Sequence, residues 1–340
     1  MLALQYCHVN TSNSVDNHFR HHSVHCETTT GSEPIPVTIL WVPATIAAAF
    51  FQNLRSAVQR HLKSELSDMG AASVRFLYAC PFALAWLVLL TLGFGLDLPK
   101  PNFAFVTWII TGSIAQITFT FLLMWLFSFS NFTVGTALSK TEVIQVVVLE
   151  AILLRELISG LATAAVVIAT AGVLIMTAGK SKLSVASLVS GLRQKSTVIG
   201  LACGFFLGLS AVLFRGAALS LEGNSILATS AYTLAVATVF QSIMMFVWLY
   251  NREPGQITGT ITHWRRCATV GFAGWIASIC WFIAFTLTNA SFVRALGQVE
   301  LLFTFLASVL IFRETVSRKE IVGVILLVVG IVVLVLEKTY

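Results

Sequence analysis

The sequence predicts an all-α integral membrane protein with ten transmembrane helices, arranged as two inverted five-helix repeats. Three observations lead to this fold class: the composition, a series of apolar segments and an internal duplication. Hydrophobic residues make up 57% of the 340 residues, and charged residues only 11%. Average soluble chains are about 45–50% apolar and about 25% charged. A water-soluble domain with so little charge could not cover its surface, so the lipid bilayer is the expected partner.

Ten apolar segments are long enough to cross a membrane, which takes about 20 helical residues for about 30 Å of hydrocarbon. Breaks as short as Phe129-Ser130-Asn131 and Thr288-Asn289-Ala290 force neighbouring helices to run antiparallel. The spans are predicted near residues 36–60, 70–95, 103–128, 132–154, 157–178, 197–220, 224–250, 266–287, 290–312 and 316–336.

The internal duplication emerges when the chain is shifted by 158 residues. Glu142 then falls on Glu300 and Arg155-Glu156 on Arg313-Glu314, and ten of 50 consecutive positions are identical without a gap. Each repeat holds five spans, an odd number, so the second repeat must enter the membrane from the opposite side. Inverted repeats are found in many secondary transporters, whose binding sites lie near the midplane where the halves meet.

The predicted domains are a polar tail (1–33), a first repeat (34–180), a basic linker (181–196) and a second repeat (197–340). The tail holds five of the seven histidines and lacks the apolar core of a signal peptide. Its segment His21-His22-Ser23-Val24-His25-Cys26 admits two interpretations, a site for Zn or Cu or simply a disordered tail.

Charge and motifs exclude several function classes. The net charge of +6 comes from 21 basic and 15 acidic residues, with the excess in short loops beside the spans, which argues against nucleic-acid binding. Six scattered cysteines without a CxxC predict neither a disulfide framework nor a zinc site. No enzyme motif and no phosphate-binding loop is present, so neither catalytic residues nor a cofactor is expected.

The ends of both repeats resemble EamA-type repeats of the drug/metabolite transporter superfamily, over about residues 36–338. The resemblance rests on residues 137–159 and 295–338, where a mid-helix Glu, a loop Glu and helix glycines match at Glu300, Glu156, Glu314, Gly172, Gly323 and Gly330. Val143 and Leu301 replace the proline that usually follows the mid-helix Glu, and Arg replaces the Gly before each loop Glu. Many relatives are also apolar or small where this chain has Lys140 and Glu142. The resemblance implies a transporter fold and no particular substrate.

Ionisable residues inside spans are costly and therefore point to function. Glu142 and Glu300 are predicted near the midplane, where they would bind a coupling proton or a cationic substrate. Lys140 and Arg294 would bind a carboxylate or phosphate, and both signs together suggest a zwitterion such as an amino acid. The alternative is that each Glu only pairs with a nearby basic residue. Lys140 and Glu142 project about 200° apart on one helix and cannot pair with each other on one face.

Other polar and small residues receive structural or open assignments. Gln298 joins Arg294 in one polar stripe, because residues four apart share a helix face. Tyr232 and Trp281 are candidate cavity aromatics. Three glycines spaced four residues apart form a small-residue ridge on the sixth span: Gly200, Gly204 and Gly208. The ridge serves either close helix packing or a gate that slides along it. Glu156 and Glu314 are predicted to stabilise helix N-termini, and Glu150 is given no role beyond pairing with Arg215 or Arg75.

The leading functional hypothesis is a secondary transporter of the bacterial inner membrane that exports a small metabolite, similar to an amino acid, or a drug, by alternating access. Proton coupling is a further hypothesis. The alternatives are a non-transporting membrane subunit or sensor and an uncoupled facilitator. The orientation stays open: twelve basic residues in the loops after spans one, five, seven and nine place both termini outside, whereas the resemblance implies both termini inside.

Overall fold

The computed structural model describes residues 39–62, 65–129, 132–180, 194–223, 225–310, 313 and 316–339. The predicted tail and linker residues 181–193 lie outside the described residues, and so does Glu314. The described helices belong to one compact unit, Pro36–Tyr340. Apart from one isolated bridge between Lys100 and Glu222, regular structure in these ranges is helical.

The helices follow the predicted spans closely. In the first half they are α1 (Trp41–Leu62), α2 (Asp68–Leu77), α3 (Ala79–Val88), the π-helical segment η2 (Leu89–Gly93), α4 (Phe103–Phe127), α5 (Phe132–Ser139), α6 (Glu142–Leu153) and α7 (Gly160–Lys180). In the second half they are α9 (Lys195–Ser220), α10 (Ile226–Arg252), α11 (Pro254–Thr262), α12 (Trp264–Leu287), α13 (Ala290–Gly297), α14 (Val299–Leu310) and α15 (Arg318–Thr339).

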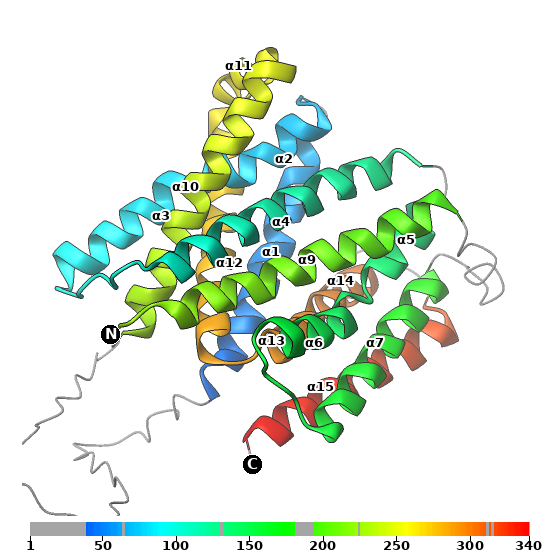
Figure 1. Ribbon diagram of the computed structural model, residues 1–340. Helices are drawn as coiled ribbons and strands as arrows, with labels where there is room; N and C mark the ends of the chain where they lie inside the picture. The colour runs from blue at the N-terminus through cyan, green and yellow to red at the C-terminus, as the bar shows by residue number, and fades with distance from the viewer. Residues whose placement is uncertain are drawn as a thin grey trace, which may run out of the picture. The chain divides into compact units, whose positions relative to one another are not determined.

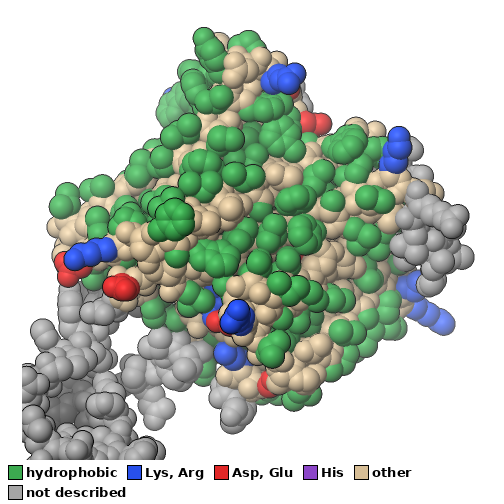
Figure 2. All heavy atoms as spheres, in the orientation of Figure 1, with side chains coloured by type: hydrophobic (Ala, Val, Ile, Leu, Met, Phe, Trp, Pro, Cys, Tyr) green, Lys and Arg blue, Asp and Glu red, His purple; other side chains and the backbone are tan. Residues whose placement is uncertain are grey.

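Eight helical segments in the described part of the chain are long and apolar enough to cross a membrane. The two other predicted spans coincide with α1 and with the pair α5–α6. Large apolar side chains are exposed along the helices; Phe103 is 87% and Leu310 72% exposed. Figure 2 shows hydrophobic side chains spread over one whole face, with few charged ones among them. Such a surface needs lipid rather than water around it.

The fourth and ninth spans differ from their prediction, because each is broken in the middle. α5 ends at Ser139 and α6 begins at Glu142, while α13 ends at Gly297 and α14 begins at Val299. At each break a backbone N–H donates a hydrogen bond to the carbonyl oxygen three residues earlier, instead of four as in an α-helix. Lys140 N–H donates to the oxygen of Ala137 (3.2 Å), and Gln298 N–H to the oxygen of Ala295 (3.2 Å). The two breaks occupy repeat-related positions, although the proline expected there in relatives is missing.

The long helices pack in pairs, each with one member from each half. α7 packs along α15, α4 along α9 and α1 along α12 (Figure 1). The α7–α15 contact depends on glycine, since a Cβ on Gly172 would lie 2.6 Å from the backbone N of Leu327, and one on Gly330 would lie 2.7 Å from that of Ala169. Small residues thus let the two backbones approach closely, as is common in membranes.

The junctions after α6 and α14 share an unusual backbone. Arg155 has a φ of 56° and Arg313 a φ of 51°, and among the residues described they are the two with positive φ apart from glycine. These are the positions where the resemblance noted above implies glycine. Glycine is favoured in this left-handed region because a Cβ is strained there, so arginine is a less suitable residue at both turns.

Candidate functional site

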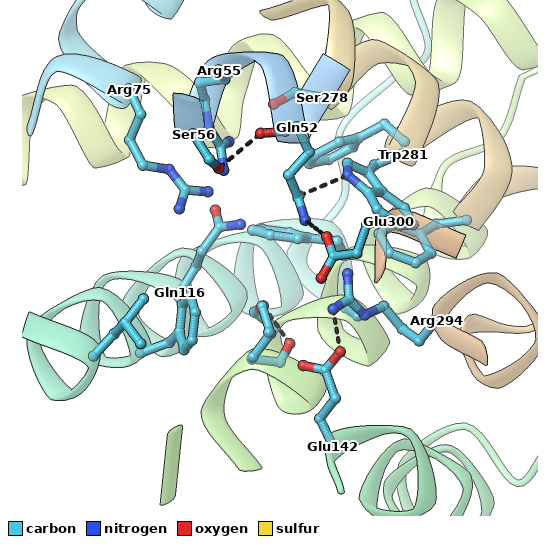
Figure 3. A pocket seen from close by; sticks show the side chains of 18 of the residues that line it. Gln52, Arg55, Ser56, Arg75, Gln116, Glu142, Ser278, Trp281, Arg294 and Glu300 are labelled. Carbon is cyan, nitrogen blue, oxygen red and sulfur yellow. Dashed lines mark hydrogen bonds and ion pairs between the residues drawn. The ribbon is translucent and has the colours of Figure 1, made fainter. Parts of the chain in front are cut away.

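A cavity of about 340 Å³ lies between the two halves, at the level of the helix breaks. Residues of α1, α2, α4, α9, α10, α12 and both broken helices line it. This volume suits a small metabolite, since ligand pockets usually measure about 300–1,000 Å³. Figure 3 shows Glu300, Arg294 and Glu142 on one side of the cavity, and Arg55, Arg75 and Gln116 on the other.

The helix breaks place charges where the helix dipoles favour them. Lys140 directly follows the C-terminal end of α5, and Arg294 lies in the last turn of α13. Glu142 and Glu300 lie in the first turns of α6 and α14. A helix C-terminus favours a cation and a helix N-terminus favours an anion. Each broken helix therefore presents one cation and one carboxylate near the centre of the molecule.

The four charges pair across the halves. Lys140 Nζ lies 2.6 Å from Oε1 of Glu300, and Arg294 Nη2 bonds to Oε1 of Glu142. Gln298 Nε2 also donates to Glu142 Oε1, at 3.3 Å. We call Lys140–Glu300 and Arg294–Glu142 the crossed ion pairs, because each joins the broken helix of one half to that of the other. The structure therefore brings together all five of the predicted charged and amide residues.

Helix α1 contributes two residues that the sequence analysis missed. Gln52 Nε2 donates to Glu300 Oε2 at 2.7 Å, and its Oε1 accepts a hydrogen bond from Trp281 Nε1 at 3.1 Å. Asn53 Nδ2 donates to the backbone oxygen of Glu300 at 2.8 Å. The sequence signal that could have identified these two residues is a pair of adjacent amide side chains within an apolar span.

Several buried polar atoms around the crossed ion pairs remain without a partner in the described part of the chain. They are Glu142 Oε2, Arg294 Nε, Gln298 Oε1 and Arg55 Nε. Buried polar groups are nearly always hydrogen-bonded, so a cluster of exceptions calls for an explanation. A polar ligand or ordered water in the cavity would supply the missing partners.

The two candidate aromatics have different positions. Trp281 lines the cavity, stacks on Phe285 with ring centroids 5.9 Å apart, and lies under the guanidinium of Arg294 at 5.0 Å. Tyr232 is not among the cavity-lining residues; its ring packs on Phe105 at 5.5 Å, within an apolar cluster. Trp281 is thus positioned to contact a ligand, and Tyr232 to support the wall behind it.

The glycine ridge of α9 lies against the first broken helix. Gly200 faces the backbone of Gly135, while a Cβ on Gly204 would lie 2.7 Å from the oxygen of Ser139 and 3.4 Å from the nitrogen of Glu142. A Cβ on Gly208 would lie 2.7 Å from Val146. The ridge leaves no room for side chains and brings α9 close to the break that carries Lys140 and Glu142.

A second charge cluster lies where α6, α9, α12 and α13 meet. Arg215 on α9 makes a bidentate contact with Glu156, Nε to Oε2 at 2.8 Å and Nη2 to Oε1 at 2.7 Å. Its Nη1 donates to the backbone oxygens of Phe285 (2.8 Å) and Thr288 (2.5 Å) at the end of α12. We call Arg215, Glu156, Glu150 and Asn289 the junction cluster.

Glu150 completes this junction cluster. Its two oxygens accept hydrogen bonds from the backbone N–H groups of Ala290 (2.6 Å) and Ser291 (3.1 Å), at the start of α13. Oε1 lies 3.5 Å from Arg215 Nε. Of the two partners considered for Glu150, the structure places Arg215 beside it. The carboxylate thus caps a helix N-terminus, where orphan N–H groups need acceptors.

Glu156 lies in the loop after α6, outside the spans. Burial raises the pKa of its carboxyl, but the hydrogen bonds and charge of Arg215 lower it more, and the net result is a pKa below the usual value. Glu156 also accepts a hydrogen bond from Asn289 Nδ2 at 3.0 Å. The ionised form of this carboxyl is therefore the one that the junction cluster binds.

Among the described residues, no group of three His, Cys, Asp or Glu side chains is placed to hold a metal ion. The histidine-rich segment 21–26, for which a metal site was considered, lies outside the described ranges.

Comparisons with known proteins place the fold. The profile of the EamA-like transporter family matches residues 194–336, which hold α9 to α14 and most of α15. Curated protein sequences give no match. Twenty-six chains of solved structures match; one, described as "Crystal structure of protein", has a TM-score of 0.63 and 14% identity, and the alignment covers 89% of this chain and 99% of that one. At this identity it supports the fold alone. The chain is a multi-pass integral membrane protein that carries an EamA-type transporter domain of the drug/metabolite transporter superfamily.

Proposed function

We propose that the protein is a secondary transporter that moves a small organic solute by alternating access between two inverted five-helix halves. The observation that carries this proposal is the cavity with its crossed ion pairs. It lies between helices of both halves, it holds unsatisfied buried polar atoms, and the crossed ion pairs that line it belong to the two helices that are broken. Discontinuous helices at the interface of repeats are typical of transporter binding sites.

The arrangement of the helices supports the proposal of ten spans in two inverted repeats. Exchanging the halves turns the pair α1–α12 into the pair α9–α4, and both are major packing contacts. The same exchange turns the break at Lys140 into the break at Gln298. It also turns the left-handed backbone of Arg155 into that of Arg313. Helices α1 and α5–α6 would complete the ten spans.

Proton coupling would act through Glu300. Its carboxylate is held by Lys140 and by Gln52, and Arg55 and Arg294 are the other charged groups around it. Protonation would remove the charge that binds Lys140 and so loosen α14 from α1 and from the first broken helix. Glu142 holds the corresponding place on α6, bound to Arg294. A proton could thereby bias the equilibrium between two arrangements of the halves, because it interacts differently with each.

The direction and the location of transport are part of the proposal. We propose export of a small metabolite or drug across a bacterial inner membrane. The presence of both charge signs suggested a zwitterion, but the crossed ion pairs neutralise one another. The solute class therefore depends on the remaining charges of the cavity.

The test is counterflow in liposomes that contain the purified full-length protein and a pH dye. Vesicles are loaded with one unlabelled solute from a panel of amino acids, organic acids, nucleobases and organic cations, and uptake of the labelled solute is followed. We expect counterflow for at least one solute and its loss in Glu300→Gln. The exposed Glu222→Gln serves as the matched control and should transport normally.

The outcomes separate the alternatives. Counterflow with a pH change that Glu300→Gln abolishes supports coupled transport, and counterflow without any pH change indicates an uncoupled facilitator. If no solute in the panel exchanges while Glu300→Gln lowers only the yield of folded protein, a non-transporting subunit or sensor replaces the proposal.

A further inference from the structure

The charges that line the cavity do not balance. Four cationic side chains face two carboxylates: Arg55, Arg75, Lys140 and Arg294 against Glu142 and Glu300. The crossed ion pairs use Lys140 and Arg294 together with both carboxylates. Two positive charges remain, and both are guanidinium groups.

The side chain of Arg55 is buried in a space that a neighbouring glycine leaves open. It lies on α1 with 8% of its surface exposed. A Cβ on Gly274 of α12 would lie 3.1 Å from Arg55 Cδ, so the glycine makes room for the arginine stem. Within the described ranges Arg55 forms no ion pair, and its Nε has no hydrogen-bond partner.

Arg75 approaches the same part of the cavity from α2 (Figure 3). Its guanidinium lies 4.9 Å from the centre of the Phe76 ring, and no carboxylate among the described residues pairs with it. In Figure 3 the amide of Gln116 lies beside the end of Arg75. Gln116 Oε1 accepts a hydrogen bond from Gln241 Nε2 at 2.7 Å, so the NH₂ group is the part of this amide that can donate to a ligand.

Two guanidinium groups and an amide donor thus lie in one part of the cavity, without an acceptor that matches their charge. Unpaired charge is costly inside a protein, and more so in a membrane. Guanidinium groups bind carboxylates and phosphates through two parallel hydrogen bonds, so an anion of this kind fits the group.

We propose that the cavity binds a small organic dianion, a dicarboxylate or a phosphate monoester, and that Arg55 and Arg75 bind its negative charge. Gln116 donates a further hydrogen bond. The rest of the solute lies toward Trp281 and the crossed ion pairs, which leave Arg294 Nε free for a second acceptor. This inference rests on the proposed transport function and specifies the class of its substrate.

The experiment measures binding and transport separately with the full-length protein in lipid nanodiscs and in liposomes. The probes are succinate and glycerol 3-phosphate as dianions, glycerol as a neutral analogue, and lysine and choline as cations. Binding is read from the shift of the unfolding temperature and by calorimetry at low salt. We expect the two dianions to bind and to exchange in counterflow, and the other probes not to.

The arginine variants test the assigned residues. Arg55→Gln and Arg75→Gln should each weaken dianion binding by about 10- to 100-fold, the usual effect of losing a charged hydrogen bond. Arg55→Lys should bind the dianions with an affinity between those of the wild type and Arg55→Gln, because lysine keeps the positive charge but cannot form two parallel hydrogen bonds to one anion. Arg252→Gln, on the exposed last turn of α10, is the matched control and should bind like the wild type.

A measurement on the wild-type protein covers the case that the Gln variants do not fold. Phenylglyoxal modifies arginine, and mass spectrometry reads the modification of each site. Succinate should slow the modification of Arg55 and Arg75, and lysine should not.

The outcomes distinguish this inference from the proposed function. Dianion binding without counterflow would overturn transport and keep the site. Counterflow of cations or neutral solutes with no dianion preference would keep transport and overturn the site. Dianion binding that is unchanged in both folded Gln variants, absence of dianion binding in the wild type, or absence of protection of the two arginines would each overturn the site.

Discussion

The crossed ion pairs and the junction cluster consist of the same kinds of residue but differ in how completely their polar groups are satisfied. In the junction cluster, Arg215 uses Nε, Nη1 and Nη2 in hydrogen bonds, and both oxygens of Glu150 accept from the backbone. Around the crossed ion pairs, Glu142 Oε2 and Arg294 Nε have no partner in the described structure, and the groups line a cavity.

The difference indicates different roles. A buried ion pair stabilises a fold only when further hydrogen bonds satisfy the remaining polar atoms. The junction cluster meets that condition and fastens the end of α12 and the start of α13 to α6 and α9. Of the crossed ion pairs, Arg294–Glu142 does not meet it, because Glu142 Oε2 and Arg294 Nε have no partner among the described residues, and Lys140–Glu300 is partly exposed to the cavity. Both pairs therefore contribute less to stability and stay available to a ligand or a proton.

The largest effect on stability is expected at Glu150. In Glu150→Gln the side-chain NH₂ group would meet the N–H groups of Ala290 and Ser291, and Arg215 would lose part of its counter-charge. Breaking a buried pair costs about 3–5 kcal/mol. Thermal unfolding of the purified protein measures the effect, with the exposed Asp97→Asn as control. Equal unfolding temperatures for Glu150→Gln and the control would remove the distinction between the two clusters.

The next effect is expected from the glycine ridge. Gly204→Leu would force α9 away from the break before Glu142, and overpacking of this kind costs about 1–3 kcal/mol. It should therefore lower both the unfolding temperature and the counterflow rate. Gly255→Leu is the matched control, because a Cβ at Gly255 of α11 meets open space. A fully active Gly204→Leu would show that the ridge does not position the crossed ion pairs.

A smaller, pH-dependent effect is expected at Glu156. Its pKa is lowered in the folded state, so its contribution to stability is complete above its ordinary value of about 4.5 and is lost as the pH falls through the folded pKa. Unfolding temperatures measured below pH 4.5 should therefore fall less steeply in Glu156→Gln than in the wild type. Glu222→Gln should keep the wild-type slope, and identical slopes in all three proteins would contradict the account.

The smallest effect is expected at the junctions with positive φ. Arg155→Gly should raise stability by up to about 1 kcal/mol, because glycine adopts this conformation without a Cβ penalty. Arg155→Ala keeps the Cβ and is the control, with no gain expected. Thermal unfolding of both variants decides the point, and a lower unfolding temperature for Arg155→Gly than for Arg155→Ala would refute strain at this turn.

The sequence predicted the positions of the helices better than their internal geometry. Span boundaries agree with the helices within a few residues, because the length of apolar runs is a direct consequence of bilayer thickness. The breaks at Lys140 and Gln298 were missed, since no proline marks either. Helix α11 was also missed, because its polar sequence resembles a loop.

The candidate site was predicted in its charges and not in its contacts. Glu142 and Glu300 stood out because a charge inside a span is costly, and this can be recognised without knowing which residue each carboxylate pairs with. Which cation joins which carboxylate depends on how the halves face each other, which one-dimensional spacing does not contain. Gln52 and Asn53 carry no charge and attracted no notice. Arg55 also lies inside a predicted span, but it is visible only in three dimensions that no carboxylate among the described residues forms an ion pair with it.

The central claim is that the crossed ion pairs serve transport rather than stability, and the double variant Lys140→Met/Glu300→Gln tests it most directly. Removing both partners of a buried pair together is often close to neutral for stability. Unfolding temperature and solute counterflow should be measured on the same preparation. The account predicts an unfolding temperature close to that of the wild type together with lost counterflow. An unfolding temperature as low as that of Glu150→Gln, or counterflow at the wild-type rate, would contradict it.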